Sequence, residues 1–273
     1  MKNFAGKTAV ITGAGAGIGR ALALELAGHG ARLALSGRNI DNVAETAARC
    51  EKKGAHARAY RLDVTDRDAV YAHADQVAGD FGGVNIVVNN AGVSLTASTE
   101  EVSWDDFEWI VNINFWGVAY GTKAFLPHVI ASGDGAIVNV SSMFGLAACP
   151  TQGAYNATKF AIRGFTDALR QEMKIAGHNV AVSCVHPGMI QTEIAWKARA
   201  GATRDRDALA ANFDRLAKTS PEQAAKAIVD GIRKDKAKVL IGNDARMIDL
   251  LPRIFGSGYQ KILTAQMRNE VGA

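Results

Sequence analysis

A tyrosine and a lysine four residues apart could together move a proton. Tyr155 and Lys159 stand at the ends of Tyr-Asn-Ala-Thr-Lys, and residues at i and i+4 share one face of a helix. A phenol has a pKa of about 10, so near neutrality it is a weak acid or base unless a nearby positive charge favours the phenolate. The pair is a candidate acid/base for chemistry at an oxygen atom, although the same spacing is common in ordinary helices.

A glycine-rich turn predicts a phosphate site. Residues 12–19 read Thr-Gly-Ala-Gly-Ala-Gly-Ile-Gly and directly follow a short apolar run at 8–12. Glycines allow a tight turn and a close backbone approach to phosphate, and the next helix offers free N–H groups to it. The spacing is GxxxGxG, and Arg20 excludes the P-loop of nucleoside triphosphatases, which ends in Gly-Lys-Ser/Thr. We predict a dinucleotide site formed by Gly13, Gly15, Gly17, Ile18 and Gly19.

The end of the second apolar run favours NADP(H). NAD sites usually place an acid there to hold the ribose 2′-hydroxyl, whereas this chain has Ser36, Gly37 and Arg38. Arg38 can bind a 2′-phosphate with its guanidinium, and Ser36 can add a hydrogen bond. The alternative is that Arg38 only serves the local structure.

The elements that must position these residues alternate between strands and helices. Apolar runs separated by helical patterns predict a parallel sheet covered on both faces. The fold class is α/β: a doubly wound, Rossmann-type sheet in a three-layer α/β/α sandwich, as one domain over residues 1–273. We expect strands at 8–12, 32–36, 57–62, 86–89, 136–140, 180–185 and 239–241. We expect helices at 18–29, 40–53, 67–81, 104–132 with a break near Pro127, 152–176 and 221–234.

Composition narrows the class of protein. The formal net charge is +4, and a basic cluster between Arg199 and Lys218 is interpreted as a solvated helical face, not a nucleic-acid surface. The three cysteines and six histidines show no metal-ligand spacing, so no metal site is predicted, and a reducing cytoplasm is the expected setting. We expect neither a signal peptide nor a membrane span.

Further motifs stand at the predicted strand ends. Ser142 follows the strand at 136–140, Asn114 lies in the long preceding helix, and Asn-Asn-Ala-Gly closes the strand at 86–89. With the glycine turn and the Tyr155 pair, these resemble the short-chain dehydrogenase/reductase family over residues 6–242. The resemblance implies that Tyr155 is the catalytic acid/base and that Lys159 lowers its pKa and binds the nicotinamide ribose. It also implies that Ser142, rather than Ser141, binds the substrate oxygen and that Asn114 holds a water beside Lys159.

The resemblance also implies a set of cofactor contacts. Asp63 and Val64 would meet the adenine, and a Pro-Gly-x-x-x-Thr turn at 187–192 would bind the nicotinamide end. The residues that would line the cofactor, beyond those of the glycine turn, are Ser36, Arg38, Asp63, Val64, Asn90, Ala91, Gly92, Tyr155, Lys159, Pro187, Gly188 and Thr192.

The substrate side is predicted to be apolar. The segment 189–220 resembles the family's substrate-binding loop and helix, and apolar pocket walls favour a lipophilic ketone, alcohol, steroid-like molecule or acyl thioester. The candidate lining residues are Ser94, Leu95, Met143, Phe144, Ile194 and Trp196. The amphipathic extension 244–273 could pack on the body, join a subunit interface or touch a membrane surface. Because family members are commonly dimers or tetramers, a homo-oligomer is expected.

These features together predict an NADP(H)-dependent oxidoreductase acting on a small-molecule alcohol or carbonyl group. The alternatives are an NAD-dependent alcohol or hydroxysteroid dehydrogenase and a non-catalytic NADP(H)-binding regulatory protein. The intact set of Asn114, Ser142, Tyr155 and Lys159 disfavours the non-catalytic alternative.

Overall fold

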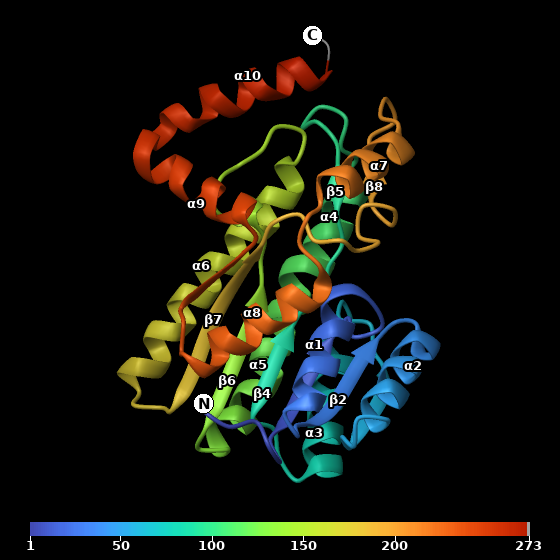
Figure 1. Ribbon diagram of the computed structural model, residues 1–273, viewed down its shortest axis with the longest axis vertical. Helices are drawn as coiled ribbons and strands as arrows, with labels where there is room; N and C mark the ends of the chain where they lie inside the picture. Colours follow the sequence, from blue (N-terminus) through green and yellow to red (C-terminus); the bar gives the residue numbers. More distant parts are fainter. Residues whose placement is uncertain (272–273) are drawn as a thin grey trace.

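Seven parallel strands form the central sheet of the computed structural model, which describes residues 1–271, with side chains up to residue 265 (Figure 1). The spatial order is β3-β2-β1-β4-β6-β7-β9. The strands are β1 (Thr8–Thr12), β2 (Arg32–Gly37), β3 (Ala57–Arg61), β4 (Ile86–Asn89), β6 (Gly135–Val140), β7 (Val180–Pro187) and β9 (Lys238–Ile241). The predicted doubly wound sheet is therefore confirmed.

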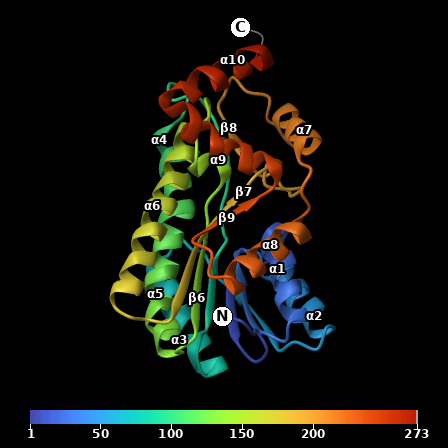
Figure 2. The same ribbon diagram turned by 60° about the vertical axis from the view of Figure 1, so that its left-hand side comes forward.

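Helices cover both faces of this sheet (Figure 2). One face carries α1 (Gly17–Gly28), α2 (Ile40–Glu51) and α8 (Pro221–Arg233). The other carries α3 (Arg67–Phe81), α5 (Gly117–Ala131) and α6 (Gly153–Ile175). Because the inner strands of a parallel sheet are buried on both sides, they are largely apolar, and every residue of β1 is buried.

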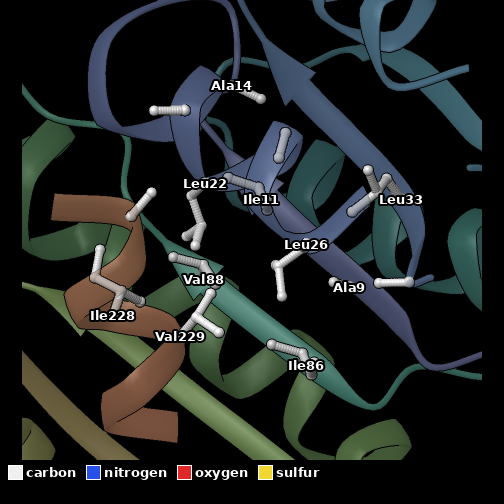
Figure 3. Packing of buried hydrophobic residues seen from close by; sticks show 14 of the residues in the cluster. Ala9, Ile11, Ala14, Leu22, Leu26, Leu33, Ile86, Val88, Ile228 and Val229 are labelled. Atoms are coloured by element: carbon white, nitrogen blue, oxygen red, sulfur yellow. The ribbon is translucent and has the colours of Figure 1, made fainter. Parts of the chain in front are cut away.

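The two layers of the core follow from the alternation of side chains along each strand. Ala9 and Ile11 of β1 pack with Leu22 and Leu26 of α1, and Ile228 and Val229 of α8 close the same layer (Figure 3). Val10, between them, belongs to the opposite layer. Each fully buried side chain of this size contributes about 1.5–3 kcal/mol, so this packing fixes the strand ends from which the site is built.

The strand order reverses direction at β1, which pairs with β2 on one side and β4 on the other. In doubly wound sheets a ligand crevice lies at the carboxyl ends of the strands where the order reverses. The glycine turn follows β1, and residues 90–92 follow β4, so both predicted motifs border this point.

The expected break near Pro127 is wrong. Helix α5 continues through Pro127, and the irregularity lies earlier, in a π-helical turn (Asn112–Trp116) between α4 (Trp104–Val111) and α5. Proline removes one backbone donor, which would have met the carbonyl of Lys123. Because Lys123 is exposed, water can satisfy that carbonyl and the helix persists.

Several further elements form the upper end of the molecule in Figure 1, where they lie beyond the carboxyl ends of the strands. A two-stranded sheet of β5 (Leu95–Thr96) and β8 (Arg199–Ala200) was not predicted, whereas α7 (Arg206–Leu216) lies in the segment for which the family resemblance implied a helix. The extension forms α9 (Asn243–Phe255) and α10 (Tyr259–Val271), while its last residues, 272–273, lie outside the described chain. Between residues 1 and 271, no helix is both long and apolar enough to cross a bilayer.

Candidate active site

The glycine turn brings backbone N–H groups to the mouth of the crevice. Gly13 (φ 68°) and Gly17 (φ 52°) have left-handed backbones that other residues rarely adopt. An added Cβ at Gly13 would lie 2.9 Å from Cα of Ala91, so glycine is also required for space. Helix α1 begins at Gly17, and within residues 1–271 no side chain caps its first N–H groups. These donors and the helix dipole fit a pyrophosphate.

Thr12 joins the two motifs of the crevice. Its hydroxyl accepts the N–H groups of Asn90 and Ala91, both at 3.1 Å. The Asn90 side chain in turn donates to the Thr12 carbonyl at 3.0 Å. The sequence reasoning did not select Thr12, although a hydroxyl at the last position of a strand before a glycine turn is a usable signal. These bonds fix the end of β4 against the predicted cofactor site.

The turn at 187–192 lies against the glycine turn. An added Cβ at Gly17 would lie 3.0 Å from Cγ2 of Thr192, so the glycine turn and the predicted nicotinamide turn almost touch. Pro187 is the last residue of β7, and Gly188 donates its N–H to the Ile241 carbonyl at 2.9 Å. The structure therefore brings Gly17, Pro187, Gly188 and Thr192 together from distant parts of the sequence.

The end of β2 carries an exposed positive charge, that of Arg38. Arg38 is exposed and makes no ion pair or hydrogen bond with any residue that the structure describes. Ser36 does not fit its predicted role. It is completely buried, its hydroxyl lies 3.5 Å from the Ile11 carbonyl, and no phosphate could reach it. Its contribution is the carbonyl that accepts the Ala14 N–H of the glycine turn at 3.1 Å.

The predicted adenine pair follows β3. Asp63 is exposed, and its carboxylate accepts both the N–H and the hydroxyl of Thr65, at 3.0 and 2.8 Å. Val64 is buried beneath Gly117 of α5, where an added Cβ would come within 2.8 Å of Val64 Cγ2. Both bonds end on the same carboxylate oxygen, Oδ1, and stabilise the turn that follows β3.

The tyrosine, lysine and serine converge at the start of α6. Tyr155 and Lys159 are both buried, and Lys159 Nζ lies 5.5 Å from the centroid of the Tyr155 ring. Ser142, just after β6, lies close enough to the Tyr155 phenol to affect its pKa. A Cβ added to Gly92 would lie 3.6 Å from Lys159 Nζ, which places the end of β4 directly beside the lysine. The two hydroxyls, of Tyr155 and Ser142, therefore lie near each other, with the Lys159 amine beside them.

Burial dominates the titration of this group. It raises the pKa of the Tyr155 phenol, while the nearby Ser142 hydroxyl opposes that rise. Burial also lowers the pKa of Lys159 to about 8, because the ammonium loses water. Its Nζ donates to the Val140 carbonyl at 3.2 Å. The predicted lowering of the Tyr155 pKa by Lys159 stays a prediction.

The π-helical turn directs Asn114 toward the end of β4. The Asn114 amide accepts the Val93 N–H at 2.8 Å and donates to the Val93 carbonyl at 3.0 Å. The extra residue in the helix turn rotates this side chain into that position, as π-bulges often do at functional sites. A Cβ on Gly92 would lie 3.2 Å from the Asn114 amide oxygen, so Asn114 and Lys159 flank the same glycine.

The His186 ring contacts the backbone of Ser142. Its Nδ1 lies 2.8 Å from the Ser142 carbonyl, and burial lowers its pKa to about 4, which leaves the ring neutral near neutral pH. The neutral ring donates from Nδ1 to that carbonyl. Ser141 is already committed, because its hydroxyl donates to the Lys159 carbonyl at 2.8 Å. The choice of Ser142 over Ser141 is consistent with these partners.

The predicted substrate wall is partly assembled. Leu95 and Phe144 belong to one apolar cluster with Tyr155, and the Phe144 ring meets the Tyr155 ring edge-on at 6.4 Å. Met143, the residue before Phe144, is also buried. Trp196 differs, because it is half-exposed and its indole N–H donates to the Asp214 carboxylate at 2.7 Å. Ser94, just before β5, and Ile194, between β7 and β8, are half-buried.

The basic cluster is not simply a solvated face. Arg199 binds the Asp106 carboxylate at 2.7 Å and lies 4.0 Å above the Trp109 ring, while its backbone pairs with Leu95. Arg204 meets Glu101 at 3.6 Å. The segment 189–220 is thereby held against α4 and the loop before it, across the upper end of the site (Figure 1).

Comparisons with known proteins agree on one family. The profile described as short chain dehydrogenase matches residues 7–203. A Mycobacterium tuberculosis protein named "Putative oxidoreductase SadH" is 54% identical over 266 residues, which cover 97% of this chain and 96% of the relative. Estradiol 17-beta-dehydrogenase 11 of Mus musculus is 32% identical over 96% of this chain and 84% of its own. A short chain dehydrogenase/reductase of Burkholderia phymatum, solved in complex with NAD, has a TM-score of 0.87 at 31% identity, covering 93% of this chain and 95% of that one.

Proposed function

Because the chain belongs to the short-chain dehydrogenase family and is an oxidoreductase, we propose that it transfers a hydride between NADP(H) and an alcohol or carbonyl carbon of a lipophilic substrate. The observation that carries this proposal is the convergence of Tyr155, Ser142 and Lys159 beside Gly92 at the carboxyl end of β4. A bound nicotinamide would supply the hydride, and the protein supplies geometry and proton transfer.

Tyr155 and Ser142 act on the substrate oxygen. During carbonyl reduction negative charge develops on that oxygen, and two hydroxyl groups aimed at it stabilise the charge. Tyr155 gives its proton to the oxygen, and Ser142 keeps a hydrogen bond to it. In the direction of alcohol oxidation the phenolate of Tyr155 takes the proton instead. Lys159 favours that phenolate through its positive charge and binds the ribose hydroxyls of the nicotinamide half.

The preference for NADP(H) rests on Arg38. An exposed guanidinium that pairs with no residue the structure describes, next to Gly37 where NAD sites usually have an acid, suits a 2′-phosphate. The second candidate is an NAD-dependent alcohol or hydroxysteroid dehydrogenase. It is favoured by the NAD complex of the Burkholderia relative and by the name of the mouse relative. Titration of the purified chain with both cofactors separates the two.

The apolar cluster around Tyr155 supports a lipophilic substrate. Leu95, Phe144 and Ala154 lie in that cluster with the reacting phenol. Such a wall gains from removing apolar substrate surface from water, at about 25 cal/mol per Å². A steroid, aryl or long-chain aliphatic ketone would gain more than a short polar ketone.

The test is consumption of NADPH by the full chain with a panel of ketones. We expect turnover with lipophilic ketones and little with short polar ones, since only the former fill the apolar wall. The Tyr155→Phe variant should lose turnover by about 10²–10⁴-fold, the usual contribution of a general acid, while binding NADPH as the unaltered chain does. Wild-type turnover in that variant, or no cofactor uptake by the unaltered chain, would refute the proposal.

A further inference from the structure

Asp244, in the first turn of α9, contacts the turn that the proposed function assigns to the nicotinamide end. Its Oδ2 accepts the Met189 N–H at 2.6 Å, and its Oδ1 accepts the N–H of Ala245 at 2.9 Å. Met189 stands in the middle of the turn at 187–192, two residues after β7 ends. One carboxylate therefore joins the start of the C-terminal extension to the edge of the cofactor crevice.

Two glycines make room for this carboxylate. An added Cβ at Gly188 would overlap both Asp244 oxygens, and one at Gly242 would overlap Oδ1. Gly188 does not have a positive φ, so the space it leaves, not its backbone conformation, is what Asp244 requires. The Gly in the Pro-Gly-x-x-x-Thr turn and the acid on α9 thus fit together.

The turn held by Asp244 ends against the glycine turn. Gln191 donates its N–H to the Thr219 carbonyl at 3.0 Å, and the next residue, Thr192, lies against Gly17. A charged acceptor on a backbone N–H forms a stronger hydrogen bond than a neutral one. Asp244 therefore fixes the near end of a short segment whose far end faces the site proposed for the cofactor.

Helix α9 is a firm support for Asp244. Asp249, one turn further along and buried, binds Lys238 of β9 at 2.7 Å and Arg253 at 2.9 Å. Beyond α9, the Tyr259 hydroxyl of α10 accepts the Ala148 N–H, at 3.2 Å, in the loop that follows Ser142. The extension thus contacts both the turn beyond β7 and the loop beyond β6.

We propose that Asp244 is a positioning residue that holds the 187–192 turn in the conformation that receives the nicotinamide half of the cofactor. This inference rests on the proposed function. Asp244 does not touch the reacting atoms. Its loss releases the Met189 N–H and weakens binding of the nicotinamide half, while the adenosine half, bound at the glycine turn and Arg38, is unaffected.

The test compares two ligands on the full chain by calorimetry: NADP⁺ and adenosine 2′,5′-bisphosphate, which lacks the nicotinamide. Asp244→Ala should weaken NADP⁺ binding by about 10-fold, the loss of one hydrogen bond to a charged group, and leave bisphosphate binding unchanged. Asp244→Asn should lie between, because its amide oxygen still accepts one N–H. Arg246→Ala, at an exposed position of the same helix, is the control and should bind both ligands normally.

A second variant guards against general unfolding. Gly188→Ala displaces the Asp244 carboxylate from an otherwise intact chain and should reproduce the selective loss of NADP⁺ binding. The positioning role would be overturned if the unaltered chain, Asp244→Ala and Gly188→Ala bound NADP⁺ equally well. It would also be overturned if Asp244→Ala lost affinity for both ligands to the same extent. If the unaltered chain takes up NAD⁺ instead, the comparison uses NAD⁺ and adenosine 5′-monophosphate. Failure of the unaltered chain to bind any of these ligands would instead refute the proposed function, and with it this inference.

Discussion

Lys159 Nζ lies 5.5 Å from the centroid of the Tyr155 ring and donates to only one protein acceptor in the described chain, the Val140 carbonyl at 3.2 Å. A buried ammonium with so few partners is costly for folding, and its pKa is correspondingly lowered to about 8. The protein retains this cost at the point where the proposed reaction needs a positive charge beside a phenol.

Replacing Lys159 should therefore separate stability from activity. Lys159→Met keeps the length and apolar contacts of the side chain but removes the buried charge, so we expect the free energy of unfolding to rise by about 1–3 kcal/mol. Turnover should fall by about 10²-fold or more, because the phenolate loses its electrostatic support. Urea unfolding near neutral pH and steady-state kinetics measure the two effects. Lower stability together with unchanged turnover would contradict both expectations.

Cofactor preference should shift when a negative charge is placed beside Arg38. Gly37→Asp puts a carboxylate next to the proposed 2′-phosphate, and like charges in contact cost several kcal/mol, so the ratio of kcat/KM for NADPH over NADH should fall by at least about 10-fold. The added Cβ would lie 3.0 Å from Val43 Cγ2, so a small shift of that methyl is needed. Gly28→Asp, which adds the same charge where the glycine has open space, is the control and should leave the ratio unchanged.

Acid should destabilise the protein through His73. This ring is buried between Tyr60 and Phe125, its Nε2 has no partner among the described residues, and burial lowers its pKa from 6.5 to about 4. Between these two pKa values the unfolded chain binds more protons than the folded chain, so the His73 contribution is complete above the unfolded pKa and is lost as the pH falls toward 4.

Removing this histidine should flatten the pH dependence of stability. Near pH 5 the His73 contribution to the loss amounts to about 2 kcal/mol, and His73→Phe should lack it. His178→Gln, at an exposed position, should behave as the unaltered chain does. Denaturant unfolding near pH 7 and pH 5 gives the comparison, and equal pH dependence in the unaltered chain and His73→Phe would exclude this role for the histidine.

Arg199 should hold the segment 189–220 in place on α4. Its guanidinium joins Asp106 and the Trp109 ring, so Arg199→Ala removes both contacts that hold segment 189–220 on α4. We expect KM for a lipophilic ketone to rise by about 3–10-fold with little change in kcat, as fits the loss of one ion pair and one cation–π contact. Protease cleavage within the segment should also become faster. Arg206→Ala, whose ion-pair partner is its exposed neighbour Asp207, should change neither.

Local patterns predicted most of the fold because each depends on a few neighbouring residues. The apolar run of β1 and the glycines after it specify a buried strand and a tight turn wherever the rest of the chain lies. Pro127 shows the limit of this reasoning. The residue is locally a helix breaker, but its effect depends on whether water can reach the carbonyl of Lys123, and only the tertiary structure sets that exposure.

By itself, the sequence predicted the seven strands of the central sheet and the helices between them, the strand ends that carry the motifs, and the candidate residues Tyr155, Lys159, Ser142 and Asn114. Only the tertiary structure decided which groups support them: the His186 ring under Ser142, the Val93 backbone against Asn114, and the Asp244 carboxylate on Met189. These partners lie 44, 21 and 55 residues apart, so no periodicity or spacing in the chain reveals them. They meet because parallel strands bring their carboxyl ends to a single edge of the sheet, whatever their separation in sequence.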